Sequence, residues 1–206
     1  MRDTSAKCRK CRREGEKLFL KGERCQTQKC AIIRRYTKPG QKPNQRPGKL
    51  SEFGKQLREK QKAKRMFGVS EKSFRNYFKK ASARKGAAGQ NFLQLLEIRL
   101  DNAIFRAGFA DSRSQARQIV SHGAFEVNGK KVDISSFSLR PGDKISVREK
   151  SLAHPVIRKI SDRKFAAPGW LKVDAKKLTV EIGRFPEPDE LESSIVVSLI
   201  IEFYSR

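Results

Sequence analysis

Apolar and polar positions in the first half of the chain follow the 3.6-residue period of amphipathic helices. The segment 50–66 places Phe53 and Leu57 on one face, and the aromatic residues of 70–85 repeat this pattern. The segment 91–107 is apolar on nearly every face, which is typical of a buried helix. The pattern therefore predicts two surface helices followed by a central one.

The stretch "SRSQARQIVSHGAFEVNG" predicts a helix that leads directly into a hairpin. Ser112 and Gln115 have the spacing of a capping box at a helix start, and Gly123 suits the helix end. Asn128-Gly129 lies between the strand-like runs "AFEV" and "KKVDI", which is a strong signal for a two-residue hairpin turn. We expect these residues to form a small helix–hairpin unit.

Short β-type patterns dominate the remainder of the chain. The runs "KISVRE", "WLKVD" and "KLTVEI" predict strands, and Ile195–Tyr204 reads as a final strand. Prolines interrupt residues 151–170, where no element is assigned. Helices followed by strands predict an α+β fold.

The elements divide the chain into three regions. Residues 1–48 contain four cysteines and end in the basic, Pro- and Gly-rich stretch 38–48, which reads as an extended linker. Residues 49–90 together with 151–206 are predicted to form a mainly helical domain. Residues 91–150 form the helix–hairpin domain, which is inserted into it.

The charge of the chain indicates the kind of partner, because the formal net charge is +25. Residues 1–90 carry 28 basic and 7 acidic side chains, which accounts for 21 of the 25 excess positive charges. A polyanion that neutralises such a charge relieves its self-repulsion, and nucleic acid is the first candidate. The N-terminal region is therefore expected to make most of the phosphate contacts.

Neither a membrane span nor a signal peptide is expected. The longest apolar run, "IVVSLIIEFY", has the length of a strand, and "MRDTSAKCRKCRREG" contains no apolar core segment. We expect a cytoplasmic protein without a membrane partner, and in that compartment its thiols stay reduced.

Cys8, Cys11, Cys25 and Cys30 are the only cysteines and lie within 23 residues. Their C-x2-C and C-x4-C pairs can bring four thiolates to one tetrahedral centre, as structural zinc prefers. The sequence predicts one structural Zn²⁺, with an iron–sulfur cluster and free thiols as the alternatives. The basic residues that could partly offset the charge of such a centre are Lys7, Arg9, Lys10, Arg12, Arg13, Arg24 and Lys29.

Both amphipathic helices carry basic residues opposite their apolar faces. Acidic residues that could form i,i+4 pairs with them are scarce, which favours phosphate contact over internal pairing. The predicted RNA contacts on these helices are Lys55, Arg58, Lys62, Arg65, Lys72, Arg75 and Lys79.

Arg113 and Arg117 lie beside the apolar face of the helix that begins at Ser112. Forked guanidinium groups on a rigid helix suit the phosphate and 2′-hydroxyl contacts by which folded RNA is recognised. An arginine pair of this kind is also common on solvated helices. Gln118 and His122 on the same helix complete the predicted RNA-binding set.

The segment Arg99–Lys150 resembles the RNA-binding domain named after small ribosomal subunit protein four. The matching positions are Arg99-Leu100-Asp101, Gly108, Ser112-Arg113, Ala116-Arg117, Gly123, Val127-Asn128-Gly129, Val132 and Gly142-Asp143. The stretches "CRREGEKLFLKGERC", "LSEFGKQLREKQKAKRMFGV", "FRNYFKKA", "GWLKVDAKKLTV" and "LIIEFYSR" resemble, in order, the family of bacterial small ribosomal subunit protein four. The resemblance covers nearly the whole chain.

This resemblance implies a helix–hairpin domain of the alpha-L type and a structural constituent of the small ribosomal subunit without catalysis. It implies binding to a multi-helix junction of 16S ribosomal RNA, nucleation of subunit assembly and a contribution to decoding accuracy. The implied neighbours are small-subunit proteins five and three and the mRNA near its entry channel. It also supports a return of the strands at 171–182 and 195–204 to the helical domain.

Two other functions compete with this one. Arg99-Leu100-Asp101 is similar to a catalytic tripeptide of pseudouridine synthases, yet only 56 residues follow Lys150, too few for a catalytic domain. A zinc-finger regulator of DNA is the second alternative. Basic stripes spread over several helices favour folded RNA over a DNA groove, which is usually read by one recognition element.

Overall fold

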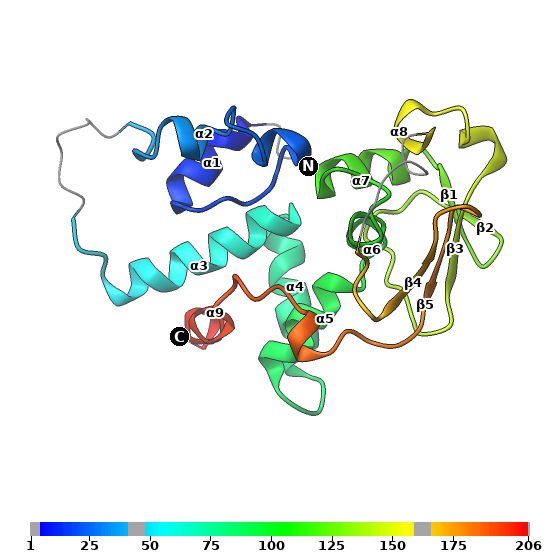
Figure 1. Cartoon of the computed structure of the whole chain (residues 1–206). Coiled ribbons are helices and arrows are strands. Elements are labelled where there is room, and N and C mark those ends of the chain that lie inside the picture. The colour runs from blue at the N-terminus through cyan, green and yellow to red at the C-terminus, as the bar shows by residue number, and fades with distance from the viewer. Residues whose placement is uncertain (1–4, 41–47, 159–165, 206) are drawn as a thin grey trace. The chain divides into compact units, whose positions relative to one another are not determined.

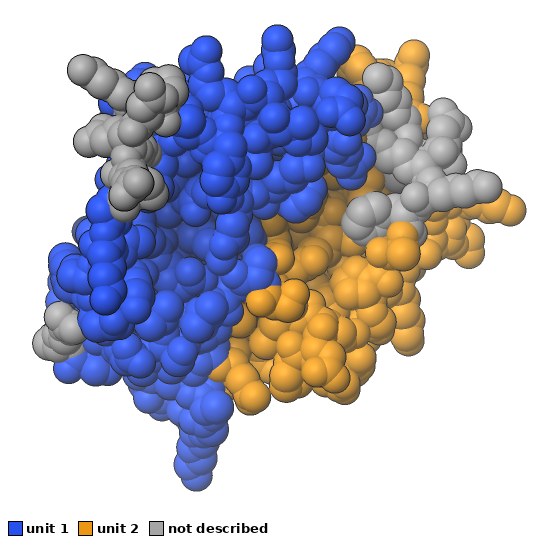
Figure 2. Space-filling view, turned by 60° about the vertical axis from the view of Figure 1, so that its left-hand side comes forward, with its two compact units in different colours: residues 1–89, 194–206 blue, residues 90–193 orange. Residues whose placement is uncertain are grey.

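A computed structural model shows the expected α+β fold and divides the chain into two compact units (Figure 1). Its described residues are 5–40, 48–158 and 166–205. Unit 1 comprises Met1–Gly89 and Ser194–Arg206, and unit 2 comprises Gln90–Ser193 (Figure 2). Unit 2 is thus inserted between the two segments of unit 1.

Unit 1 begins with a small cysteine-containing region, residues 5–40, which we call the knob. It contains α1 (Lys7–Glu14), a 3-10 turn (Gly22–Cys25) and α2 (Ala31–Arg34). Cys11, Cys25, Cys30 and Leu18 are its buried apolar residues. These few apolar side chains bury little area. Regions with so small a core are usually stabilised further by a cross-link or a metal ion.

The two predicted surface helices are present as α3 (Glu52–Phe67) and α4 (Glu71–Ser82). Serine caps start both, because the side chains of Ser51 and Ser70 accept hydrogen bonds from backbone N–H groups of their first turns. Phe67 and Phe74 are buried on their apolar faces. The 3.6-residue period therefore located both helices correctly.

The prediction of a final strand over Ile195–Tyr204 is wrong, because this segment forms the helix α9 (Val197–Tyr204). Its aromatic residues pack on α3 and α4: Phe203 stacks on Phe53 with ring centroids 5.7 Å apart, and Tyr204 stacks on Phe78 at 4.6 Å. β-branched residues favour strands only weakly, so this packing overrides their local preference.

The predicted single helix over 91–107 is two helices, α5 (Ala88–Glu97) and α6 (Leu100–Arg106). At the break, Arg99 is extended and forms a β-bridge with Ser138. The N–H of Leu100 donates to the Phe137 carbonyl, and the N–H of Leu139 donates to the Ile98 carbonyl. Hydrogen bonds with a segment distant in sequence thus replace helical ones, which the spacing of side chains cannot reveal.

The helix–hairpin unit is confirmed in unit 2. Helix α7 (Arg113–Ser121) is followed by β1 (Phe125–Val127) and β2 (Lys130–Val132). Asn128 and Gly129 have φ values of 51° and 76°, which suit the two-residue turn between twisted strands.

The hairpin belongs to a larger antiparallel sheet with the strand order β2-β1-β3-β5-β4 (Figure 1). Its other strands are β3 (Lys144–Val147), β4 (Leu171–Asp174) and β5 (Thr179–Ile182). The expected return of 171–182 to the helical domain is therefore wrong, because β5 pairs with β3. Of the C-terminal region, only Ser194–Arg206 joins unit 1.

The core of unit 2 lies where α6 and α7 pack with this sheet. Its fully buried residues include Phe109, Phe125, Ile145, Trp170 and Val180. Burial of such large apolar side chains contributes on the order of 2 kcal/mol each.

Short elements complete unit 2: a 3-10 turn (Glu149–Ser151), α8 (Pro155–Arg158) and a second 3-10 turn (Pro188–Glu190). Part of the unassigned segment 151–170, residues 159–165, lies outside the described residues, as does 41–47 of the expected linker 38–48. Among the helices that the structure describes, none is both long and apolar enough to cross a membrane.

Candidate nucleic-acid interface

All four cysteines lie in the knob. Cys8 and Cys11 lie on α1, Cys25 ends the 3-10 turn and Cys30 precedes α2. Burial raises the pKa of the Cys11 thiol, a backbone hydrogen bond from Leu18 opposes this, and the other three cysteines raise the pKa further. The thiols of Cys8, Cys25 and Cys30 are therefore near enough to Cys11 to influence its pKa.

Backbone N–H groups are directed at two of the sulfurs. Besides the bond at Cys11, the N–H of Lys21 donates to Cys25 Sγ at 3.4 Å. Within residues 5–40, 48–158 and 166–205, no three Cys, His, Asp or Glu side chains are grouped as closely as a formed metal site requires. The predicted ligand set thus lies in one small region, while its coordination stays a prediction.

Ion pairs attach the knob to α3. The buried side chain of Glu14 accepts hydrogen bonds from Arg65 and, at 3.4 Å, from Arg58. Burial raises the pKa of Glu14 despite the opposing effect of these two guanidinium groups. Two predicted RNA contacts on α3 therefore also hold the knob in place.

Lys62, a third predicted RNA contact on α3, is also paired with carboxylates. Only 7% of its side chain is exposed, and its Nζ lies 2.9 Å from Glu16 and 3.3 Å from Glu59. Although burial opposes it, pairing with these carboxylates raises the pKa of Lys62. Direct RNA contact by Lys62 would require this ammonium group to leave two carboxylates.

The expectation that the basic stripe of α3 lacks acidic partners is wrong. The partners Glu14 and Glu16 come from the knob, far away in the sequence, and Glu59 is an i,i+3 neighbour that an i,i+4 search passes over. Lys55, also on α3, is exposed and pairs with Glu52 at 2.7 Å. RNA contact by the α3 residues stays a prediction.

Helix α4 presents its predicted contacts differently. Lys72, Arg75 and Lys79 are all exposed, whereas Phe74 and Ala81 on the same helix are buried. An exposed row of cations opposite a buried face is the arrangement that neutralises phosphates at least cost, because few internal ion pairs must be broken.

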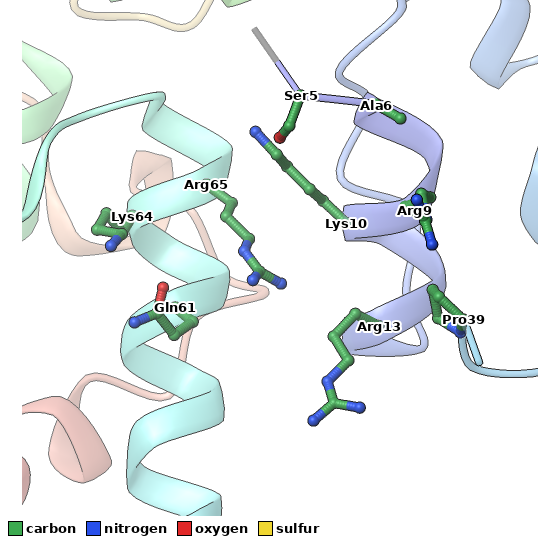
Figure 3. Close-up of a pocket in the computed structure, with 9 residues that line it drawn as sticks. All are labelled: Ser5, Ala6, Arg9, Lys10, Arg13, Pro39, Gln61, Lys64 and Arg65. Atoms are coloured by element: carbon green, nitrogen blue, oxygen red, sulfur yellow. The ribbon is translucent and has the colours of Figure 1, made fainter. Parts of the chain in front are cut away.

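Two clefts with basic walls lie in unit 1. The first, about 410 Å³, lies between α1 and α3, and Lys10 and Arg65 extend into it from the two helices (Figure 3). The second, about 320 Å³, lies in the knob and is lined by Arg12, Arg24, Lys29, Ala31, Arg34 and Arg35. Of the basic residues that line the two clefts, only Arg65 is among the predicted RNA contacts, although the strong positive charge of residues 1–90 pointed to this region.

In unit 2, Arg113 is held by three groups. Its Nε donates to Asn102 at 2.7 Å, its Nη2 donates to Glu192 at 3.0 Å, and its guanidinium lies 4.7 Å from the ring centroid of Phe105. Only 11% of the side chain is exposed. Burial lowers the pKa of Arg113 although Glu97 and Glu192 raise it.

Arg117 is bound to Asp101, to which its Nε donates at 2.8 Å. Asp101 is buried and also accepts two hydrogen bonds from Arg99, at 3.0 and 2.8 Å. The tripeptide that resembles a synthase motif thus forms a structural ion pair. RNA contact by Arg113 and Arg117 stays a prediction that competes with their carboxylate partners.

A second buried carboxylate, Glu97, joins α5 to α6. Glu97 has no exposed surface and accepts two hydrogen bonds from Arg106, at 3.0 and 2.8 Å, and one from Asn102 at 2.6 Å. Such charged groups stabilise a fold only when all of them are paired. These acidic partners are not predicted by the sequence, since a periodic pattern does not show which distant side chains meet.

Gln118 and His122, the remaining predicted contacts, are exposed at the end of α7. Together, the helical unit with basic clefts and the helix–hairpin unit define a protein of the RNA-binding class. Two family comparisons agree: residues 2–97 match "Ribosomal protein S4/S9 N-terminal domain" and residues 98–145 match "S4 domain".

Similar proteins extend over the whole chain. A protein of Natranaerobius thermophilus is 50% identical over 97% of this chain and 96% of its own length. Proteins of Acetivibrio thermocellus and Thermodesulfovibrio yellowstonii are each 51% identical over the full chain and 99% of their own length. All three are named small ribosomal subunit protein uS4, and this chain belongs to that family.

Proposed function

We propose that this protein is a structural constituent of the small ribosomal subunit that binds 16S ribosomal RNA and acts at the ribosome in the cytoplasm. The observation that carries the proposal is the pair of basic clefts and the exposed cations of α4, in a chain that matches its family from end to end. Release of counterions from RNA phosphates provides the free energy of such binding.

A structural function without catalysis fits the chemistry of unit 2. Both carboxylate oxygens of Asp101 are engaged by arginines, and the side chain is buried. A general base needs access to the proton that it removes. This arrangement favours a structural function over that of a pseudouridine synthase.

Binding of the full-length protein to a 16S rRNA transcript and to duplex DNA of equal length tests the proposal. We expect tighter binding to the transcript and a linear fall of log K with log salt concentration, with a slope of roughly −0.7 to −0.9 per neutralised phosphate. Equal affinity for duplex DNA would favour a zinc-finger regulator. Co-sedimentation with small subunits provides an independent measurement.

The membership of the family supports finer proposals. The protein nucleates assembly at a multi-helix junction of the RNA, lies beside small-subunit proteins five and three near the mRNA entry channel, and contributes to decoding accuracy. Depletion of the protein followed by analysis of assembly intermediates tests the first of these, and reporter measurements of misreading test the last.

We also propose that Cys8, Cys11, Cys25 and Cys30 hold one structural Zn²⁺. The location of all four thiols in the knob and the N–H groups directed at Cys11 and Cys25 support this proposal, because thiolate ligands usually accept such hydrogen bonds. The bound ion would supply folding free energy that the small apolar core of the knob lacks.

Elemental analysis of purified protein tests the metal. We expect about one zinc per chain, while iron with labile sulfide would identify the iron–sulfur alternative. Replacement Cys25→Ser should abolish stoichiometric zinc, and a metal content equal to wild type would contradict the proposed ligand set.

A further inference from the structure

The cleft between α1 and α3 has a composition suited to an anion. Its walls carry Arg9, Lys10 and Arg13 from α1 and Lys64 and Arg65 from α3, together with Ser5, Ala6, Pro39 and Gln61. No acidic side chain is among these lining residues.

The knob fold explains why the cations of α1 reach this cleft. Residues two positions apart on an α-helix differ by about 200° around its axis, so Arg9 and Arg13 both lie opposite Cys11. Cys11 is buried, and Arg9 and Arg13 are exposed. Because the Cys11 face of α1 is buried against the rest of the knob, Arg9 and Arg13 face away from the interior of the knob.

The opposite wall is fixed by an internal carboxylate. Glu14 accepts a hydrogen bond from Arg65, and only 2% of the Glu14 side chain is exposed. The anchored guanidinium extends towards α1, where Lys10 extends in the opposite direction (Figure 3). A binding group that is already ordered loses less conformational entropy when its ligand arrives.

We infer that this cleft is a binding site for the phosphodiester backbone of RNA, formed jointly by the knob and α3. This inference rests on the proposed function and adds a specific site to it. Forked guanidinium groups and an ammonium group match phosphate oxygens, and the Gln61 amide provides a group suited to a ribose hydroxyl. The second basic cleft in the same knob suits a ligand that carries phosphates in succession.

The test uses the full-length chain with three alanine replacements, Arg9→Ala, Lys10→Ala and Arg13→Ala. Arg12 is left unchanged, because its Nε donates to the Thr37 carbonyl at 2.9 Å and supports the knob. The matched control replaces Lys172, Lys176 and Lys177 by alanine, which removes the same charge from exposed positions in and beside β4.

Filter binding to a 16S rRNA transcript is measured over a range of salt concentrations. We expect the cleft variant to lose roughly ten- to a hundredfold in affinity and its log–log slope to fall in magnitude by about 2, as loss of two to three phosphate contacts requires. The control should change the slope by less than about 1. Equal losses in both variants, or a cleft variant that binds like wild type, would overturn the inference.

The folding of the knob is monitored by the reactivity of its cysteines, of which Cys11, Cys25 and Cys30 are buried. If the triple variant exposes these thiols, the single variant Lys10→Glu is tested in its place. We expect its affinity for the transcript to fall about tenfold while the thiols stay protected. Unchanged affinity of that variant would overturn the inference. Failure of wild-type protein to bind any transcript would instead contradict the proposed function itself.

Discussion

The predicted RNA contacts on α4 of unit 1 and on α7 of unit 2 lie in opposite environments. In unit 1, Lys72, Arg75 and Lys79 of α4 are exposed. In unit 2, Arg113 and Arg117 of α7 are bound to the carboxylates Glu192 and Asp101. Both sets were predicted as RNA contacts from the same kind of pattern, basic residues on one side of a helix.

The supply of acidic residues accounts for the difference. Residues 1–90 contain 28 basic and 7 acidic side chains, whereas residues 91–206 contain 19 and 15. The few carboxylates of unit 1 pair with the cations of α3, so that the cations of α4 face solvent. A basic stripe therefore predicts phosphate contact best where its surroundings lack carboxylates.

Glu97→Ala is expected to have the largest effect, because it leaves Arg106 and Asn102 without their buried partner. Loss of one member of a buried pair costs about 3–5 kcal/mol, and the partial exposure of Arg106 favours the lower end. Denaturant unfolding followed by the fluorescence of Trp170, the only tryptophan and fully buried in unit 2, measures the change. Glu181→Ala, at an exposed pair, is the control and should cost less than about 1 kcal/mol.

Removal of the exposed cations of α4 comes next. The triple variant Lys72→Ala, Arg75→Ala, Lys79→Ala should weaken binding to 16S rRNA roughly ten- to a hundredfold and reduce the salt slope by about 2 in magnitude. Its unfolding should match that of wild type, since none of the three side chains is buried. A loss no larger than that of the Lys172, Lys176, Lys177 control would abolish the contrast between the units.

Arg117→Ala should act mainly on stability. Asp101 is buried and would keep only Arg99, so unfolding of unit 2 should become easier by about 1–2 kcal/mol, with the exposed part of Arg117 limiting the effect. The salt slope should change by less than about 1. Arg140→Ala is the control, because it removes an equal charge from an exposed position. It should not change the unfolding transition that is followed by the fluorescence of Trp170. A fall of the salt slope by about 1 or more with unchanged stability would instead confirm the predicted RNA contact of Arg117.

The smallest effects concern the carboxylates that join the elements of unit 1. Although burial opposes it, hydrogen bonds from Lys60 and Lys64 lower the pKa of Glu71 below 4.5. The stability that Glu71 contributes is thus present above pH 4.5 and is lost as the pH falls through its lowered pKa in the folded protein. The free energy of unfolding of wild type should exceed that of Glu71→Gln at pH 7, and the difference should shrink as the pH falls below 4.5.

Glu14 should behave with the opposite sign, because burial raises its pKa above 4.5. Its protonated form is favoured in the folded protein, so its contribution is lost as the pH rises through the raised pKa. Glu14→Gln should therefore keep or gain stability at neutral pH. A loss at pH 7 equal to that of Glu71→Gln would show that the two carboxylates are equivalent.

Local patterns located much of this fold. Period 3.6 found α3 and α4, and the Asn-Gly pair found the hairpin, because in each case the signal lies within a few residues. The break at Arg99 and the helix α9 depend on partners distant in sequence, Ser138 and the aromatic residues of α3 and α4. Side-chain spacing within a segment carries no information about such partners.

The sequence also predicted only part of the candidate interface. Positions on α4 need only a helix and an exposed face, and both follow from the sequence. The ion pairs of Arg58, Lys62 and Arg65 require that Glu14 and Glu16 meet α3, which follows from the docking of the knob. The cleft between α1 and α3 follows from the same docking and was missed for the same reason.

The insertion of unit 2 has a consequence for synthesis of the chain. Helix α9 is synthesised after unit 2, yet it packs on helices that are complete by Ser82. Contacts between such distant segments form late. The aromatic side chains of α3 and α4 that α9 covers should therefore stay uncovered until α9 has been synthesised, whereas the intervening unit can fold earlier. A nascent chain stalled before Val197 should accordingly bind chaperones or hydrophobic dyes through its first unit.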